Sequence, residues 1–349
     1  MAASLRLDGM AAADSSPQSS LPYISVVIPT YNRASILPYL FDALGKQVYP
    51  AARMEAIVVD NSSSDDTEAV VMRWRQALPF PLTFHRKENR GPAASRNVGA
   101  MLARGEIIGF TDSDCVPSPG WLRAAARAFA GGAGLVCGPI LPRLREGQPG
   151  LMASQLPAAT RDDGLYPTAN LLIRKQALEA AGGFNEQLGL NPWGDLVAGE
   201  DADLAWRVKR TGVQAVFDEH VVVGHMATRI RASALLLRPF RVQVMPWLVR
   251  TIPELRWTYL WKHYFMSSSR VYYYLAVAGL AAAALTRHWA LIVTTVPWLA
   301  FHGAGTTVSL VRRGEVAKAI AWLCLVAWFD TVTTCALVLG SVRNRRLVL

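Results

Sequence analysis

The chain has 349 residues, of which 52% are hydrophobic, and its 36 lysines and arginines outnumber 26 aspartates and glutamates, giving a formal net charge of +10. The apolar content excludes a disordered protein, and the length exceeds that of a single minimal fold. Four widely spaced cysteines without a CxxC pair argue against a disulfide framework or a structural zinc site.

The first 23 residues differ in composition from those that follow. They contain acidic residues and a Ser/Gln/Pro-rich stretch where a secretory signal would need an apolar core. We therefore interpret residues 1–23 as a flexible leader, and we expect the folded part after it to stay in the cytoplasm.

From residue 24 onward, short apolar runs alternate with segments of helical pattern. The pattern predicts strands at 24–29, 55–59, 82–85 and 106–110, with helices at 35–46, 65–76 and 90–103 between them. Continuous apolar strands separated by helices indicate a parallel sheet that is covered on both faces. The predicted fold class is therefore α/β, with a Rossmann-like, mostly parallel sheet whose ligands bind at the carboxyl ends of the strands.

Polar side chains follow three of the predicted strands. They are Thr30, Tyr31 and Asn32 after the first, Asp60, Asn61 and Ser62 after the second, and Thr111, Asp112, Ser113 and Asp114 after the fourth. Each group alone is typical of a turn or a helix cap. Three such groups at one edge of a sheet favour a binding site.

The Asp112-Ser113-Asp114 step indicates metal chemistry. Alternate residues of an extended segment point the same way, so both carboxylates can face one ligand. They would repel each other unless a cation or hydrogen-bond donors neutralised them, and hard oxygen ligands select Mg²⁺ or Mn²⁺. The pattern arises often by chance, but its place after a fourth parallel strand increases its weight.

The segment from Asn89 to Asn97 opens a helix with Gly-Pro-Ala-Ala and carries two arginines, Arg90 and Arg96. Free backbone N–H groups and fixed positive charge together bind anionic or nucleotide groups. A proline at the start of a helix with small residues for close packing explains Gly91 to Ala94 equally well. It does not explain the arginines.

Farther along, the pattern predicts a strand at 167–175, a helix at 176–181 and an amphipathic helix beginning at Gly199. Asp203 and Arg207 are spaced to form an ion pair on that last helix. Glu200 and Asp201 open it, where the helix dipole favours anions. That position suits a cap, and it equally presents a carboxylate to a cleft as a general base.

The excess positive charge lies entirely in the last third of the chain. Up to Thr228 there are 21 basic and 23 acidic residues, a net charge of −2, whereas the remainder holds 15 and 3, a net charge of +12. The near-neutral folded part disfavours a nucleic-acid-binding domain. We interpret 229–270, which alternates Arg and Lys with aromatic and aliphatic residues, as a basic amphipathic interfacial segment, the alternative being a basic surface helix of a soluble domain.

Residues 271–349 are expected to form two or three transmembrane helices. Two runs, 288–311 and 319–342, hold no charged residue except Asp330 and exceed the ~20 residues that cross a hydrocarbon core. A third candidate, 271–286, is shorter and rich in Ala and Tyr. The positive-inside rule mildly favours two spans.

The stretch from about Ile24 to Met226 resembles the catalytic domain of glycosyltransferase family 2, which has the GT-A fold. The matching motifs, in the family's order, are VVIPTYNR (Val26–Arg33), VVDNSSSDDT (Val58–Thr67), NRGPAASRNVGA (Asn89–Ala100), FTDSDCVPSPGWL (Phe110–Leu122), TANLLIRKQALEAAGGFNE (Thr168–Glu186) and GEDADLAWRV (Gly199–Val208). We therefore expect a GT-A catalytic domain at 24–228.

The resemblance implies an inverting, Mn²⁺- or Mg²⁺-dependent enzyme that uses a UDP-, GDP- or dTDP-sugar. It implies that Asp201 is the catalytic base with Glu200 beside it, and that Asp112 and Asp114 hold ribose, metal and diphosphate. The residues that it implies for nucleotide binding are Pro29, Tyr31, Asn32, Asp60, Arg96 and Asp112. His225 lies where some GT-A enzymes have a third metal ligand, the alternative being a core or interfacial histidine.

The QxxRW motif of processive family members is missing, so we expect the addition of one sugar rather than extrusion of a polymer. The basic apolar tail indicates the cytoplasmic (inner) membrane, with membrane lipids as partners. The catalytic domain would face the cytoplasm and a lipid-linked or cell-envelope glycan would be the acceptor.

Two other functions remain open at this stage. A nucleotidyltransferase would also use a nucleotide-binding sheet and Mg²⁺ carboxylates, but it would be expected to carry a glycine-rich loop after the first strand, where this chain has Pro-Thr-Tyr-Asn-Arg. A non-enzymatic membrane scaffold on a transferase fold is the other. It would tolerate loss of Asp114 or Asp201.

Overall fold

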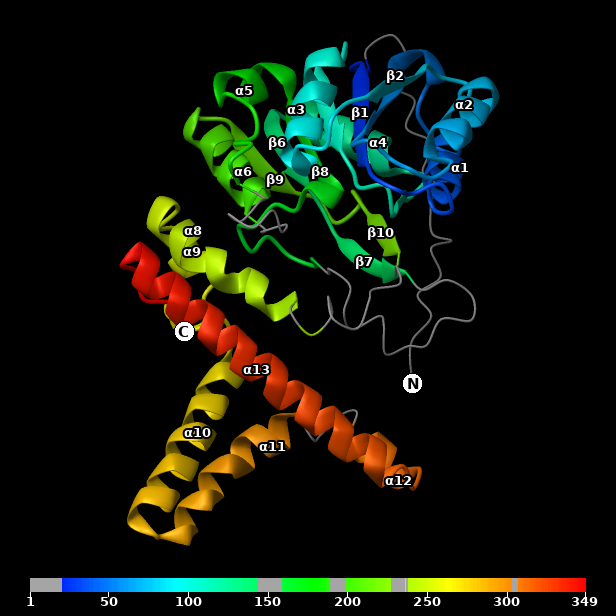
Figure 1. Ribbon diagram of the computed structural model, residues 1–349. Helices are drawn as coiled ribbons and strands as arrows, with labels where there is room; N and C mark the ends of the chain where they lie inside the picture. Colours follow the sequence, from blue (N-terminus) through cyan, green and yellow to red (C-terminus); the bar gives the residue numbers. More distant parts are fainter. Residues whose placement is uncertain (1–20, 144–158, 189–198, 227–235, 237, 303–306) are drawn as a thin grey trace. The chain divides into compact units, whose positions relative to one another are not determined.

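The computed structural model describes residues 21–143, 159–188, 199–226, 236, 238–302 and 307–349 (Figure 1). The chain divides into two compact units, residues 1–229 and 230–349. Parts of four sequence expectations lie outside the described residues: 1–20 of the leader, 144–158, 189–198 and 227–228 of the catalytic domain, 229–235 and 237 of the interfacial segment, and 303–306 of a membrane span. The predicted domain boundaries stay a prediction.

A seven-stranded sheet forms the centre of the first unit, in the order β3-β2-β1-β4-β8-β6-β9. Only β8 runs antiparallel to its neighbours, so the predicted mostly parallel α/β class is confirmed. The strands are β1 (Ile24–Thr30), β2 (Met54–Asp60), β3 (Leu82–Arg86), β4 (Ile107–Phe110), β6 (Ala133–Cys137), β8 (Leu171–Arg174) and β9 (Gln214–Phe217).

Helices cover both faces of this sheet, as the continuous burial of β1 and β2 requires. They are α1 (Leu37–Gly45), α2 (Thr67–Ala77), α3 (Gly91–Leu102), α4 (Trp121–Ala130), α5 (Lys175–Ala180) and α6 (Glu200–Arg210), with short 3₁₀ turns η2 (Ala51–Arg53) and η4 (Thr168–Asn170). The predicted ion pair on α6 is present, with 2.6 Å between Arg207 Nη2 and an Asp203 carboxylate oxygen.

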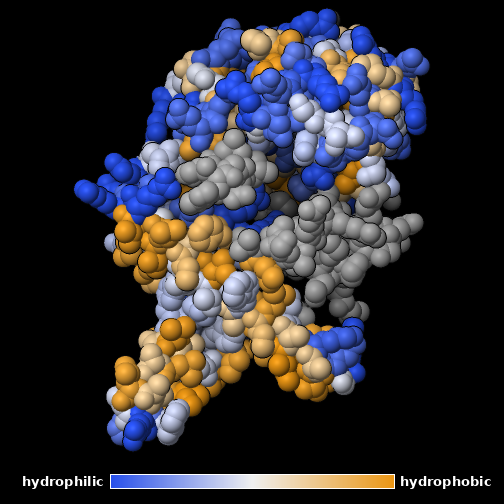
Figure 2. All heavy atoms as spheres, in the orientation of Figure 1, coloured by the Kyte–Doolittle hydropathy of each residue, from blue (hydrophilic) through white to orange (hydrophobic). Residues whose placement is uncertain are grey.

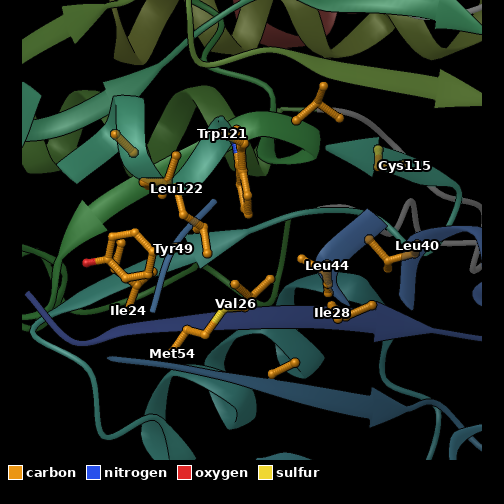
Figure 3. Packing of buried hydrophobic residues seen from close by; sticks show 14 of the residues in the cluster. Ile24, Val26, Ile28, Leu40, Leu44, Tyr49, Met54, Cys115, Trp121 and Leu122 are labelled. Carbon is orange, nitrogen blue, oxygen red and sulfur yellow. The ribbon is translucent and has the colours of Figure 1, made fainter. Parts of the chain in front are cut away.

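Alternation along β1 assigns its side chains to two different layers. Ile24, Val26 and Ile28 join the core that α1 and α4 cover, where Trp121 is fully buried (Figure 3). Val27 points to the opposite face, against α3. A Cβ on Gly99 of α3 would lie only 2.3 Å from a Val27 methyl carbon, so glycine at this position allows α3 to approach β1 closely.

The predicted strand at 167–175 is shorter in the structure. Pro167 has a φ of −61°, and the Asn170 N–H donates to its carbonyl over 3.0 Å, which closes the turn η4 before β8 begins. The sequence pattern therefore misassigned residues 168–170. This turn carries Thr168 into the site described below.

A second, three-stranded sheet was not predicted. It consists of β5 (Cys115–Pro117), β10 (Val223–Met226) and β7 (Ile140–Arg143), with β10 in the middle. The antiparallel pairing of β10 with β5 sets His225 directly opposite Cys115. Residues directly opposite each other share a face of the sheet, so this register brings His225 beside the Asp112-Ser113-Asp114 step.

The second unit is helical. It contains η5 (Arg238–Val244), α8 (Met245–Thr251), α9 (Leu255–Thr258), α10 (Ser268–Thr286), η6 (Trp289–Thr295), α11 (Val296–His302), α12 (Val308–Arg312) and α13 (Val316–Asn344). Asp330 of α13 connects three of these helices, because its carboxylate lies 3.0 Å from Arg270 of α10 and accepts a 2.8 Å hydrogen bond from the indole of Trp298 in α11.

Within the described part of this unit, α13 is the one helix long and apolar enough to cross a membrane. The other predicted long span, 288–311, is divided among η6, α11 and α12, and Pro297 lies in the first turn of α11, where its missing N–H is tolerated. Figure 2 shows hydrophobic side chains over α10, α11 and α13. Leu280, Phe301 and Leu339 are among the exposed large hydrophobic residues of these helices. The number of spans stays a prediction.

Candidate active site

The loops after β1 and β2 hold each other in place. Asn32 adopts a left-handed φ of 53°, its N–H donates to Ser63 Oγ over 2.8 Å, and its side-chain oxygen accepts from the Ser64 N–H over 2.8 Å. Asp60 is fully buried and accepts hydrogen bonds from the Ser63 N–H and hydroxyl. These bonds fix the edge of the sheet where Pro29 is the last residue but one of β1 and where Tyr31, 49% exposed, faces solvent.

Four potential metal ligands gather where the two sheets meet. The ligand atoms of Asp112, Asp114, Cys115 and His225 all lie within 4.8 Å of one another, with 3.5 Å between His225 Nε2 and Asp114 Oδ1. Burial raises the pKa of the Cys115 thiol well above its usual value. A hard cation such as Mg²⁺ or Mn²⁺ favours the two carboxylates and the imidazole over a thiol.

Electrostatics at Asp114 suit a bound cation. Burial raises the pKa of Asp114 above its usual value, nearby His225 and Arg33 oppose this rise, and Asp112 adds to it. Arg33 Nη2 lies 3.5 Å from Asp114 Oδ2. A desolvated carboxylate beside a second carboxylate is stabilised by positive charge, and an oxygen-rich set with one imidazole fits Mn²⁺ or Mg²⁺.

Arg96 of α3 lies buried between carboxylates from two other elements. Its guanidinium is 3.0 Å from Asp112, 3.2 Å from Glu200 and 3.7 Å from Asp201, and 6% of its side chain is exposed. These three carboxylates raise the pKa of Arg96 despite its burial. The arginine thus links the loop after β4 to the start of α6.

Asp201 is oriented by η4. The Thr168 N–H donates to Asp201 Oδ2 and the Thr168 hydroxyl donates to Asp201 Oδ1, both over 3.0 Å. Burial and the neighbouring Glu200 raise the pKa of Asp201 to about 7, although Arg96 and the Thr168 N–H act in the opposite direction. A carboxylate with a pKa near neutrality is suited to accept and release a proton.

Residues 25–184 match the family model for glycosyl transferase family 2. These residues form a glycosyl transferase family 2 domain. Glycosyltransferase AglE of Haloferax volcanii is 29% identical over 244 residues, which are 67% of this chain and 77% of that protein. Validoxylamine A glucosyltransferase of Streptomyces hygroscopicus is 34% identical over 113 residues, which are 32% of this chain and 27% of that one.

Two solved structures resemble this chain in fold. The first is the mannosyltransferase PcManGT of Pyrobaculum calidifontis, in complex with GDP-Man and Mn²⁺, which is 22% identical in sequence and has a TM-score of 0.56. The aligned part covers 94% of this chain and 88% of the PcManGT chain. The second is S. aureus TarS 1–349, in complex with UDP-GlcNAc, which is 18% identical in sequence and has a TM-score of 0.51. The aligned part covers 93% of this chain and 92% of the TarS chain. The expected GT-A fold is therefore confirmed.

The structure brings most of the sequence-predicted site residues into two connected groups. Arg96, Asp112, Glu200 and Asp201 share ion pairs, and Asp112, Asp114 and His225 form the potential metal site. The remaining four, Pro29, Tyr31, Asn32 and Asp60, lie at the ends of β1 and β2. Their individual roles stay predictions.

Sequence reasoning missed three residues at the candidate site: Arg33, Cys115 and Thr168. Arg33 ends the VVIPTYNR motif, but a lone arginine gave no sign of its contact with Asp114. Thr168 was assigned to a strand, and Cys115 was considered only for disulfide or zinc spacing. All three contacts depend on tertiary pairing.

Replacing Arg96 tests whether the buried guanidinium holds the site together. In Arg96→Ala, Glu200 loses its partner inside the protein, and we expect the free energy of unfolding to fall by about 3–5 kcal/mol. Arg90→Ala is the matched control, because Arg90 is 68% exposed and pairs with Glu186 at 3.3 Å, a surface contact worth under about 1 kcal/mol. Denaturant titration in mild detergent measures the free energy of unfolding of both variants. An equal loss of stability in Arg96→Ala and Arg90→Ala would contradict the role of Arg96 in holding the site together.

Proposed function

We propose that this protein transfers a single sugar, with inversion, from a nucleotide-sugar donor to a lipid-linked or cell-envelope glycan acceptor at the cytoplasmic face of the membrane. The observation that carries the proposal is the buried Arg96, which joins Asp112 on the metal side of the site to Asp201 on the other. This arrangement supports the proposal that a diphosphate-holding group and a base act together at one edge of the sheet.

On the donor side, Asp112, Asp114 and His225 would hold Mn²⁺ or Mg²⁺. When bound, the cation neutralises the charge of the leaving diphosphate. Pro29, Tyr31, Asn32 and Asp60 would bind the nucleotide at the neighbouring strand ends. The GDP-Man and Mn²⁺ present in PcManGT and the UDP-GlcNAc present in TarS support a UDP-, GDP- or dTDP-sugar as the donor class.

On the acceptor side, Asp201 would remove the proton from the attacking hydroxyl. The acceptor oxygen forms its bond to the anomeric carbon as the bond to the diphosphate oxygen breaks, and the proton moves to an Asp201 carboxylate oxygen. Attack from the face opposite the diphosphate inverts the anomeric centre. Glu200 Oε2 is buried without a hydrogen-bond partner among the described residues, which suits an acceptor hydroxyl.

Membrane attachment is supported by α13 and by the concentration of positive charge in the last third of the chain. Attachment of the chain to the membrane would keep the site close to acceptors that are themselves anchored there. The missing QxxRW motif supports the addition of one sugar rather than processive synthesis.

Metal dependence is tested with detergent-purified protein and a panel of UDP-, GDP- and dTDP-sugars, scoring nucleotide release with Mn²⁺ or Mg²⁺. His225→Ala removes one ligand and should raise the Mn²⁺ concentration for half-maximal release at least tenfold. His220→Ala is the matched control, since this exposed histidine lies 3.1 Å from Asp218 and away from the cluster. No release with any donor would count against the transferase itself.

The pH dependence tests the base. Asp201 must be ionised to accept a proton, so transfer should rise as pH increases through about 7. Thr168→Val removes a hydroxyl that stabilises the ionised form and should move this rise to higher pH, whereas Thr168→Ser should keep it near 7. A pH–rate profile that is identical in the two variants would exclude this assignment.

A further inference from the structure

An aromatic loop rich in basic residues is exposed in the second unit. This segment, residues 256–265 and called here the aromatic–basic loop, begins with the last residues of α9. Its second half is closed by a pair of backbone hydrogen bonds between Trp261 and Phe265, at 2.8 and 3.0 Å. Trp257 is 72% exposed, Tyr264 49% and Trp261 41%. Large aromatic side chains with this much exposure are unusual on a surface that faces only water.

The aromatic–basic loop is fastened to the carboxyl end of α13. The Leu349 N–H donates to the Tyr264 carbonyl over 2.8 Å, and the Met266 N–H donates to the Leu349 carbonyl over 2.7 Å. Arg256 Nη2 donates to the Leu347 carbonyl over 3.3 Å. Figure 1 accordingly shows the C-terminus beside α9. The loop therefore lies at the level where the apolar helix ends.

Positive charge dominates this end of the second unit. From residue 251 to 266 and from 331 to 349 there are five basic residues and one acidic residue, Glu254. The five are Arg256, Lys262, Arg343, Arg345 and Arg346. Two of the cations lie over the loop's aromatic rings, with Arg256 5.3 Å from the ring centre of Tyr264 and Lys262 5.8 Å from that of Trp261.

The backbone of the aromatic–basic loop is strained at its tip. Lys262 and His263 are consecutive non-glycine residues with left-handed φ values of 51° and 68°. Such conformations persist only where other contacts impose them. Here Arg256 Nη1 donates to the His263 carbonyl over 3.1 Å, and the Trp257 and His263 rings lie 4.1 Å apart. The exposed side chains are thus held in place before any partner binds.

We propose that the aromatic–basic loop, together with Arg343, Arg345 and Arg346, binds the headgroups of anionic phospholipids. Tryptophan and tyrosine are favoured at the headgroup level of a bilayer, and clustered Lys and Arg at the end of a spanning helix attract anionic lipids. The charge and the position at the end of α13 select lipid as the occupant. This inference rests on the membrane attachment in the proposed function.

The test uses the full chain in nanodiscs of phosphatidylcholine and phosphatidylglycerol, with one lipid brominated to quench tryptophan fluorescence. The chain has 11 tryptophans, so the fluorescence of the loop's two is obtained by subtracting the signal of the Trp257→Phe/Trp261→Phe variant from that of the parent. Brominated phosphatidylglycerol should quench this contribution more than brominated phosphatidylcholine at the same mole fraction. In the variant Lys262→Gln/Arg345→Gln/Arg346→Gln, the excess of quenching by phosphatidylglycerol over quenching by phosphatidylcholine should fall about fivefold.

The matched control is Arg312→Gln/Arg313→Gln, which removes charge before the opposite end of α13 and should leave the excess unchanged. Equal quenching by the two lipids would overturn the proposal. So would the absence of quenching by either, which would instead assign the surface to a protein partner. Nucleotide release, measured in the same samples, separates this inference from the proposed transferase activity. If no nucleotide is released but the lipid preference is intact, only the transferase proposal is contradicted. If the chain does not enter the nanodisc, membrane attachment and this inference are both contradicted.

Discussion

The burial of one guanidinium among three carboxylates is the constraint on which the site depends. Arg96 comes from α3, Asp112 from the loop after β4, and Glu200 and Asp201 from the start of α6. A buried charge without its partner is strongly destabilising, so these three segments keep their relative positions. The metal side and the base side are consequently one electrostatic unit.

The placement of Arg96 follows from small residues on the face of α3 that meets the sheet. Gly91 begins the helix with a φ of 84°, a conformation that glycine adopts readily. Gly99 allows the helix to approach Val27 of β1. From the sequence, the Gly-Pro-Ala-Ala helix start could be explained by packing alone. The same close packing also brings Arg96 to the carboxylates of the site.

Much of the fold could be predicted because the first four strands are short, apolar and separated by helices. The polar residues after these strands follow from the same pattern, and they include most of the site. The antiparallel direction of β8 and the second sheet could not be predicted, because pairing between residues as distant as Cys115 and His225 leaves no local periodicity. The same holds for the contacts of Arg96 and Thr168, which depend on tertiary structure.

The net charge of +10 likewise separates into two parts with different partners. The first unit gathers carboxylates around the buried Arg96, an arrangement suited to a cation and a diphosphate. The second combines an apolar helix with exposed cations, which suits an anionic bilayer. Each unit therefore uses electrostatics in its own way, and in the proposed function the second unit would attach the chain to the membrane while the first carries out the transfer.

The most direct test of the central claim is a comparison of nucleotide binding and sugar transfer in Asp201→Asn. Asparagine keeps the shape of the side chain but cannot act as the base. The account predicts that affinity for nucleoside diphosphate with Mn²⁺, measured by calorimetry, stays within about threefold of the parent, while transfer falls by a factor of about 10²–10⁴. Unchanged transfer, or loss of nucleotide binding together with transfer, would contradict it.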